Sequence, residues 1–328
     1  SGTGTLNGGP LAAGIANTGT LSLTGSANQI LSGVITGSGS LVKSGSGILT
    51  LSAASTFSGT TSVNGGTLIV DGSGSLDAAS AVTIGSAGTL KGGGVVNGGV
   101  TVSPGGTLTG GNGSTGMLTL GSLSFNSTAT VNIGGLENYA SSAAVESLGA
   151  LALNGGAGAV TLNLPTAPIA AGTYHLISFG TTSATASQFA LGTAPALGSR
   201  QSGSLVVDGG SGFVNYEVTG INPTWTGAVS GEWSTATLAS PKNWFTNVET
   251  DYINGDAVTF DDSVGSGATA ISLNTTVTPS SVTFANSGVN YSVSGTGGIA
   301  GAAASLTKSG TGTVTVGQNG TVAGNVTS

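Results

Sequence analysis

The chain has 328 residues, of which 61 are Gly, only 5% are charged and none is Cys. Lys and Arg number 5 against 12 Asp and Glu, so nucleic-acid binding through clustered phosphate contacts is not expected. The missing Cys excludes disulfides, zinc–thiolate sites and thiol catalysis, and no apolar run is long enough for a membrane-spanning helix. An apolar share of 38% argues against disorder.

Residues 1–135 consist of short β-prone runs separated by Gly, Asn and Ser. The runs at 49–51, 67–70 and 100–102 alternate apolar and polar residues with the period of two that is typical of strands. Strands this short are not stable as isolated hairpins, but they can pair as coils stacked about 4.8 Å apart. We therefore predict β-solenoid repeats over residues 1–135.

Residues 136–222 are predicted to continue the solenoid with longer strands, such as those at 159–164 and 174–179. The stretch 143–148 also allows one or two helical turns, which would need packing to be stable. His175 is the sole His, and its place within the second of these strands indicates a packed or rim position rather than a catalytic one.

The composition changes over residues 223–262, where Trp225, Trp233 and Trp244 are the only Trp residues of the chain. We interpret this stretch as a Trp-rich junction element. The three side chains either pack in a core, which is the commoner role, or form a contact cluster on which sugar rings stack. Residues 263–328 resume the solenoid pattern.

One motif occurs twice, as LVKSGSGILTL and as LTKSGTGTVTV, and an internal repeat predicts stacked units that bury their apolar faces on one another. We expect its lysines to be solvated strand residues that discourage lateral pairing, or else to contact a neighbouring coil or chain. We expect its glycines at corners or stacking positions that tolerate no Cβ. The shared positions are Leu41, Lys43, Gly45 and Gly47 in the first copy and Leu306, Lys308, Gly310 and Gly312 in the second.

The first copy resembles the autotransporter-associated β-strand repeat of bacterial autotransporter-type passenger proteins. The family pattern continues with Leu51, Phe57 and Gly59 in this sequence, whereas Ser55 stands where the family usually has Asn. The stretch around Trp225, Asn243-Trp244 and Gly255-Asp256 is similar to a Trp-rich passage that alternates with such repeats in very large secreted proteins. Both resemblances imply a right-handed parallel β-helix on the bacterial cell surface, exported across the outer membrane, without catalytic residues.

Candidate chemistry is sparse. Asp261 and Asp262 are adjacent, with Asp256 nearby, but neighbours on a strand point to opposite faces, so we expect turn or cap roles, with calcium binding as the alternative. Polysaccharide lyases on β-helices combine clustered acids with a basic residue, and the only Arg here, Arg200, is far from these acids in the sequence.

The sequence therefore predicts an all-β, right-handed parallel β-helix or β-solenoid with a Trp-rich junction element. We expect a non-enzymatic structural segment of a large secreted cell-surface protein, acting as stalk, matrix or filament, and no cofactor or metal. The alternative is a carbohydrate-binding or polysaccharide-degrading β-helix. Both ends of the sequence read as strand and turn, so we expect copies of the chain or further repeats to stack end to end, with surface glycans as the other candidate partners.

Overall fold

The computed structural model describes residues 6, 8–110, 116–136, 142–167, 169, 171–300, 305–317, 321–322 and 325–327. Within these residues the only helices are two 3-10 turns, η1 (Ala186–Gln188) and η2 (Asp262–Val264), and the strands stack as coils. The prediction of an all-β parallel solenoid is confirmed. The chain divides into two compact units. The first comprises residues 1–165, 173–194 and 204–217, and the second comprises residues 166–172, 195–203 and 218–328.

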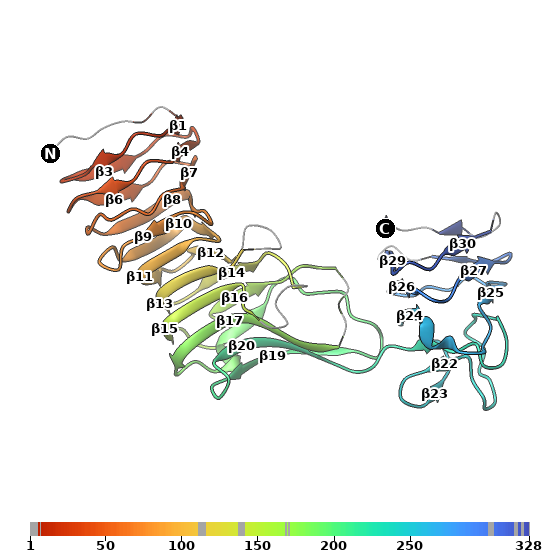
Figure 1. The fold of residues 1–328 in the computed structure, drawn as a ribbon. Helices are drawn as coiled ribbons and strands as arrows, with labels where there is room; N and C mark the ends of the chain where they lie inside the picture. The colour runs from red at the N-terminus through yellow and green to blue at the C-terminus, as the bar shows by residue number, and fades with distance from the viewer. Residues whose placement is uncertain are drawn as a thin grey trace. The chain divides into compact units, whose positions relative to one another are not determined.

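The first unit is a stack of coils, and each coil runs along three β-faces in turn (Figure 1). The stacking is parallel, and the first register is 20 residues: Gly9 pairs with Gln29, and Thr20 pairs with Ser40. Later coils are longer, because Val131 pairs with Leu162, which lies 31 residues further along the chain. Their extra length lies outside the paired strands, so the faces continue without interruption.

The strands of the first unit are grouped here by face. The first face has β1 (Gly9–Leu11), β4 (Gln29–Leu31), β7 (Ile48–Leu51), the second halves of β8 (Thr61–Val70) and β10 (Val82–Gly92), β12 (Thr107–Gly110), β14 (Ala129–Ile133), β16 (Val160–Asn163) and β18 (Phe189–Leu191). The second face has β2 (Ile15–Ala16), β5 (Ile35–Thr36), β9 (Ser75–Leu76), the first halves of β11 (Val95–Val102), β13 (Leu118–Phe125) and β15 (Val145–Leu153), and part of β17 (Gly172–Thr182). The third face has β3 (Thr20–Leu23), β6 (Ser40–Lys43) and the remaining halves of the long strands, while β19 (Ser202–Asp208) and β20 (Phe213–Thr219) belong to the same sheet.

Inward and outward positions alternate along every strand of this unit, and each position stacks on its equivalent in the next coil. A buried column on the first face consists of Leu49, Leu68, Leu90, Leu108, Val131 and Leu162. Burying such a side chain contributes roughly 1.5–3 kcal/mol. The adjacent outward column consists of Thr67, Thr89, Thr107, Thr130 and Thr161. Stacked Thr side chains, rather than charges, therefore cover this face, which explains the low charge of the chain.

The helical turns allowed at 143–148 are wrong, because Val145 begins strand β15. Val145 pairs with Leu118 of β13 on one side and with Ile177 of β17 on the other. Hydrogen bonding to strands on both sides outweighs the weak helix propensity of this stretch.

The second unit contains a second parallel solenoid, with a register of 24 residues from Ala257 to Ser281 and again from Ser281 to Ser305. Its first face has β21 (Thr224–Trp225), β24 (Ala257–Asp261), β26 (Ser281–Ala285), β29 (Ser305–Ser309) and β32 (Asn325–Thr327). The other faces have β25 (Ala270–Ser272), β27 (Tyr291–Ser294) and β30 (Val314–Val316), and then β28 (Gly298–Ile299) and β31 (Thr321–Val322).

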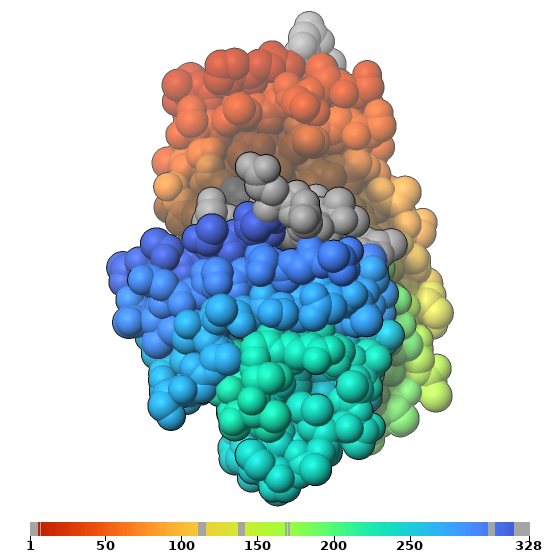
Figure 2. Space-filling model, turned by 90° about the vertical axis from the view of Figure 1, so that its right-hand side faces the viewer, coloured from red at the N-terminus to blue at the C-terminus, as the bar shows by residue number. Residues whose placement is uncertain are grey.

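The Trp-rich stretch forms a cap on the first coil of this second solenoid. β21 is parallel to β24, but β22 (Trp244–Phe245) and β23 (Glu249–Thr250) add to it in antiparallel order. The space-filling view shows residues 223–262, in cyan-green and light blue, at one end of this unit, beneath the blue coils (Figure 2). The cap therefore ends the parallel stack on that side and buries its own aromatic core.

The buried tyrosines of this unit predict a dependence of its stability on pH. Tyr252 is 1% and Tyr291 2% exposed, and burial, with nearby Asp charges, raises the pKa of both hydroxyls above the ordinary value of 10.0. Above about pH 10 the unfolded chain therefore releases protons that the folded unit still holds, so the free energy of unfolding falls as the pH rises, and this contribution is constant below about pH 9.

We expect Trp emission, which reports only on the cap of the second unit, to shift to the red between about pH 10 and 12 as this unit unfolds. Replacing Tyr252 by Phe should move the midpoint of this transition to higher pH. An unchanged midpoint in this variant would contradict the assignment of the alkaline transition to the buried tyrosines.

Candidate functional site

The lysine of the first motif copy lies inside the solenoid. Lys43 is the last residue of β6, and its Cα partners in the adjacent coils are the buried Leu23 and Val63. Its side chain is 2% exposed, so the aliphatic stem occupies a place in an apolar column. The expectation of a solvated lysine is wrong at this position, and the alternative of a contact with a neighbouring coil is what the structure shows.

The ammonium group of Lys43 binds backbone carbonyl groups at a corner of the solenoid. Nζ donates to the carbonyl oxygen of Gly45 in its own coil and to that of Gly65, at 3.1 Å, in the next coil. Burial lowers the pKa of this ammonium. The carbonyl oxygens satisfy a charge that would otherwise be costly to bury, and the lysine links two successive coils.

Lys308, in the second motif copy, repeats this arrangement in the second unit. It is half-buried on β29, and its Cα partner in the preceding coil is the core residue Phe284. Its Nζ donates to the carbonyl oxygens of Asn286 in that coil, at 3.3 Å, and of Ser309 and Gly310 in its own coil, at 2.6 and 2.9 Å. A lysine in a core column with its charge on corner carbonyls is therefore a feature of both solenoids.

The motif glycines lie where one coil passes closest to another. An added Cβ would lie within 2.4 Å of a backbone oxygen of the preceding coil at Gly45, Gly47, Gly310 and Gly312, and at Gly59 as well. Gly310 also has a φ of +78°, which L side chains rarely adopt. Carbonyl groups thus crowd these corners, and the lysine ammonium binds part of the same crowd.

The remaining motif positions pack into the core. Ser55, at the position where related repeats usually have Asn, is buried, and its Oγ accepts a hydrogen bond from the amide of Ile35 at 3.3 Å. The Ser hydroxyl therefore bridges to the previous coil at this corner. The buried apolar positions of the motif are Leu41, Leu51, Phe57 and Leu306.

The three tryptophans form one buried cluster in the cap. Trp225 and Trp233 are 0% exposed and Trp244 is 2% exposed. The ring centroids of Trp225 and Trp244 lie 4.9 Å apart, those of Trp233 and Trp244 lie 5.6 Å apart, and Phe260 of the first coil packs against all three. The structure thus places these side chains in a core, and none of them has an exposed ring face on which a sugar could stack.

Arg200 and Asp256, which are far apart in sequence, form an ion pair beneath the cap. Arg200 Nε lies 2.9 Å from Asp256 Oδ1, which also accepts from Ser199 Oγ at 2.9 Å. The guanidinium further donates to Thr250 Oγ1 and to the carbonyl oxygen of Asp251, at 2.9 and 2.6 Å. Asp256 is fully buried, so this network fixes segment 195–203 to the second unit. Sequence reasoning missed this pair, because no periodic pattern links its members.

The other candidate catalytic groups are engaged in local structure. Asp261 Oδ1 accepts from the amide of Ser263 at 2.9 Å, and the carboxylate of Asp262 accepts from three amides of the next coil, which begin with that of Ser287. The hydrogen bond from Ser287 is the main reason why the pKa of Asp262 is lowered. His175 stacks on Phe213 with ring centroids 4.0 Å apart. Across the described part of the chain, no three His, Asp or Glu side chains are grouped as metal ligands.

Comparison with known proteins identifies the repeat. Residues 41–70 match the family model described as passenger-associated-transport-repeat, and this segment runs from the strand that carries Lys43 to the end of β8. A comparison with curated proteins found no match. None of the helices in the described residues has the length and apolar character needed to cross a membrane. The chain thus contains a passenger-associated-transport-repeat within a parallel β-solenoid.

The lysine corner predicts an unusual pair of mutational effects. Lys43→Met keeps the apolar stem but leaves the carbonyl oxygens of Gly45 and Gly65 without this donor, which should lower the free energy of unfolding by about 1–2 kcal/mol after partial relief from burying a charge. Lys43→Ala also empties the column and should cost about 2–5 kcal/mol. Denaturant unfolding measures both effects.

The matched control is Lys91→Met. Lys91 lies at an outward, half-exposed position of β10, so its loss should change the free energy of unfolding by less than about 0.5 kcal/mol. Equal effects of Lys43→Met and Lys91→Met would contradict the corner role of Lys43.

Proposed function

We propose that this chain is a structural, non-enzymatic segment of a passenger-type protein that bacteria export to their surface, where its solenoids serve as a stalk or matrix component. The observation that carries the proposal is the match of residues 41–70 to the passenger-associated-transport-repeat. The same residues form the lysine corner, so what the repeat encodes here is the joining of one coil to the next.

The arrangement of polar groups supports a mechanical role. Asp256, Asp261 and Asp262, the acids that a lyase-like reading of the sequence would use, hold an ion pair, a turn and an adjacent coil. A stack in which each coil binds only its neighbours can be lengthened or shortened by whole coils without a change in its cross-section. Such a design suits a spacer, whose function depends on length and stiffness.

Surface location is tested on intact cells of the source bacterium. Antibodies raised against this chain should label cells that have not been permeabilised, and external protease should remove the label while a periplasmic marker stays protected. Labelling only after permeabilisation would contradict the proposal. Release of new reducing ends from polysaccharides by the purified chain would instead favour the polysaccharide-degrading alternative.

The spacer role is tested by removing coils from the natural protein. Deleting residues 82–99 removes one complete coil, because Val82 pairs with Val100 and Leu90 with Leu108. We expect this variant to fold and to reach the surface in normal amounts. Deleting residues 82–90 takes out about half a coil, turns inward positions outward and should abolish surface display. Loss of display in both variants would contradict a modular spacer.

A further inference from the structure

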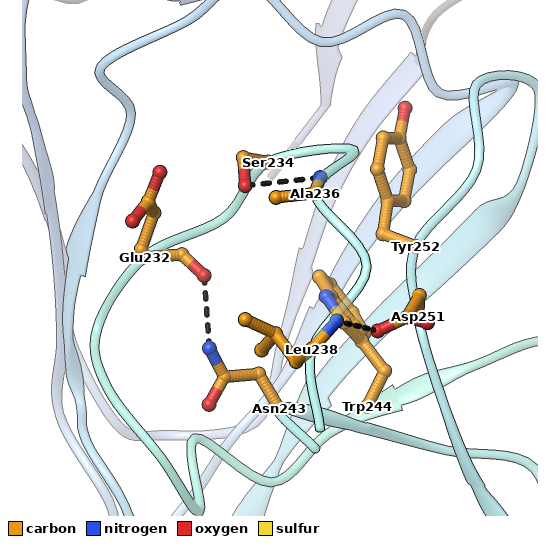
Figure 3. Close-up of a pocket in the computed structure, with 8 residues that line it drawn as sticks. All are labelled: Glu232, Ser234, Ala236, Leu238, Asn243, Trp244, Asp251 and Tyr252. Atoms are coloured by element: carbon orange, nitrogen blue, oxygen red, sulfur yellow. Dashed lines mark hydrogen bonds between the residues drawn. The ribbon is translucent and has the colours of Figure 1, made fainter. Parts of the chain in front are cut away.

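The cap of the second unit contains a small pocket that its structural role does not explain. Figure 3 shows the pocket between the loop that carries Ser234 and Leu238 and the segments that carry Trp244 and Tyr252. The space amounts to about 260 Å³, counted out to its open mouth, and its floor has room for about one water-sized group. The residues that matter for its chemistry are Glu232, Ser234, Leu238, Trp244, Asp251 and Tyr252.

The indole N–H of Trp244 is an unpaired donor in this pocket. Trp244 is 98% buried, and its Nε1 has no hydrogen-bond partner among the described residues. A buried donor without a partner costs about 1–3 kcal/mol. By contrast, Trp225 in the same cluster donates to the carbonyl oxygen of Ala268 at 2.7 Å. The ring of Trp244 extends toward the space between Leu238 and Tyr252 (Figure 3), so an oxygen atom bound in the pocket would satisfy its N–H.

Acceptor groups line the same space. Asp251 is held in place by the amide of Leu238, 3.0 Å from Oδ1, and by the ammonium of Lys242 on Oδ2. Although burial acts to raise it, the pKa of Asp251 is lowered by these partners, so a carboxylate is present at neutral pH. The hydroxyl oxygen of Ser234 accepts from the amide of Ala236 at 3.3 Å and keeps its own proton for a ligand.

This combination selects a neutral ligand that both donates and accepts hydrogen bonds. The carboxylates of Glu232 and Asp251 disfavour an anion, and the inward N–H of Trp244 disfavours a cation. The rings of Trp244 and Tyr252 and the side chain of Leu238 supply apolar walls. Sugars carry hydroxyl groups and apolar C–H faces together, and aromatic walls with a few placed polar groups are typical of small-molecule sites.

We propose that this pocket binds the terminal neutral sugar of a glycan, with one hydroxyl group on the floor between Trp244 Nε1 and Asp251. The floor admits one such group, and the sugar ring lies at the open mouth beside Ser234. Recognition of one terminal residue gives weak binding, with a Kd of about 1–10 mM for a free monosaccharide. The proposal does not depend on the stalk function, because the pocket lies in the cap and not on the stacked faces.

The test uses the three indole N–H signals of the full chain in a ¹H–¹⁵N spectrum. The chain has three Trp residues, all in the cap, so each signal reports on this element. Glucose, galactose, mannose and N-acetylglucosamine are titrated separately, with sodium sulfate as an anion control. We expect at least one sugar to shift the Trp244 signal in a saturable manner and sulfate to leave it unchanged.

Two variants make the test specific. Trp244→Phe removes the donor and should abolish the saturable response, whereas Trp233→Phe removes another unpartnered buried indole N–H that does not line the pocket, and should preserve it. Ser234→Ala, on a half-exposed loop residue, should weaken binding at least 3-fold without unfolding the cap, as the remaining indole signals would show. No shift with any of the four sugars, a response to sulfate alone, or an equal loss in Trp233→Phe would overturn the proposal.

Discussion

The structure depends on one constraint, which is that every coil must close within the spacing of a parallel strand ladder. Strands pair at about 4.8 Å, so at each corner the backbone of one coil passes directly over that of the coil below. At Gly45 and Gly47 the carbonyl oxygens of the preceding coil occupy the space that a Cβ would need. The faces tolerate variation in Leu, Val and Thr, but these corners admit only Gly, and this requirement shapes the composition of the chain.

The same crowding explains why a lysine can be buried. Carbonyl groups that converge at a corner create a region of negative potential, and the ammonium of Lys43 or Lys308 binds there while its stem continues an apolar column. The charge is stabilised by hydrogen bonds to two coils at once. In the first unit Lys43 stacks between aliphatic residues, and in the second Lys308 follows Phe284, so the device is independent of what packs around it. The repeat is therefore best described as a corner that locks neighbouring coils.

Much of this architecture could be predicted from the sequence. The period of two in the short runs identified the strands and their buried residues, and repetition at similar spacings indicated stacking. The inward position of Lys43 was encoded in the same way, since it alternates with Leu41, but the charge of its side chain favoured an outward interpretation. What could not be predicted are features without periodicity. The ion pair of Arg200 with Asp256 and the antiparallel cap depend on contacts between distant segments, and only the tertiary structure brings these together.

The most direct test of the account is the register of neighbouring coils. Thr107 and Thr130 are outward Cα partners on β12 and β14, and a separation of about 4.8 Å is within the range that a disulfide requires. The natural chain has no Cys, so Thr107→Cys combined with Thr130→Cys has no competing thiol. The account predicts that this pair forms a disulfide under mild oxidation with the solenoid intact, whereas Thr107→Cys with Asn132→Cys, two residues out of register, does not. Preferential cross-linking of the second pair, or of neither, would contradict the stacking on which the structure depends.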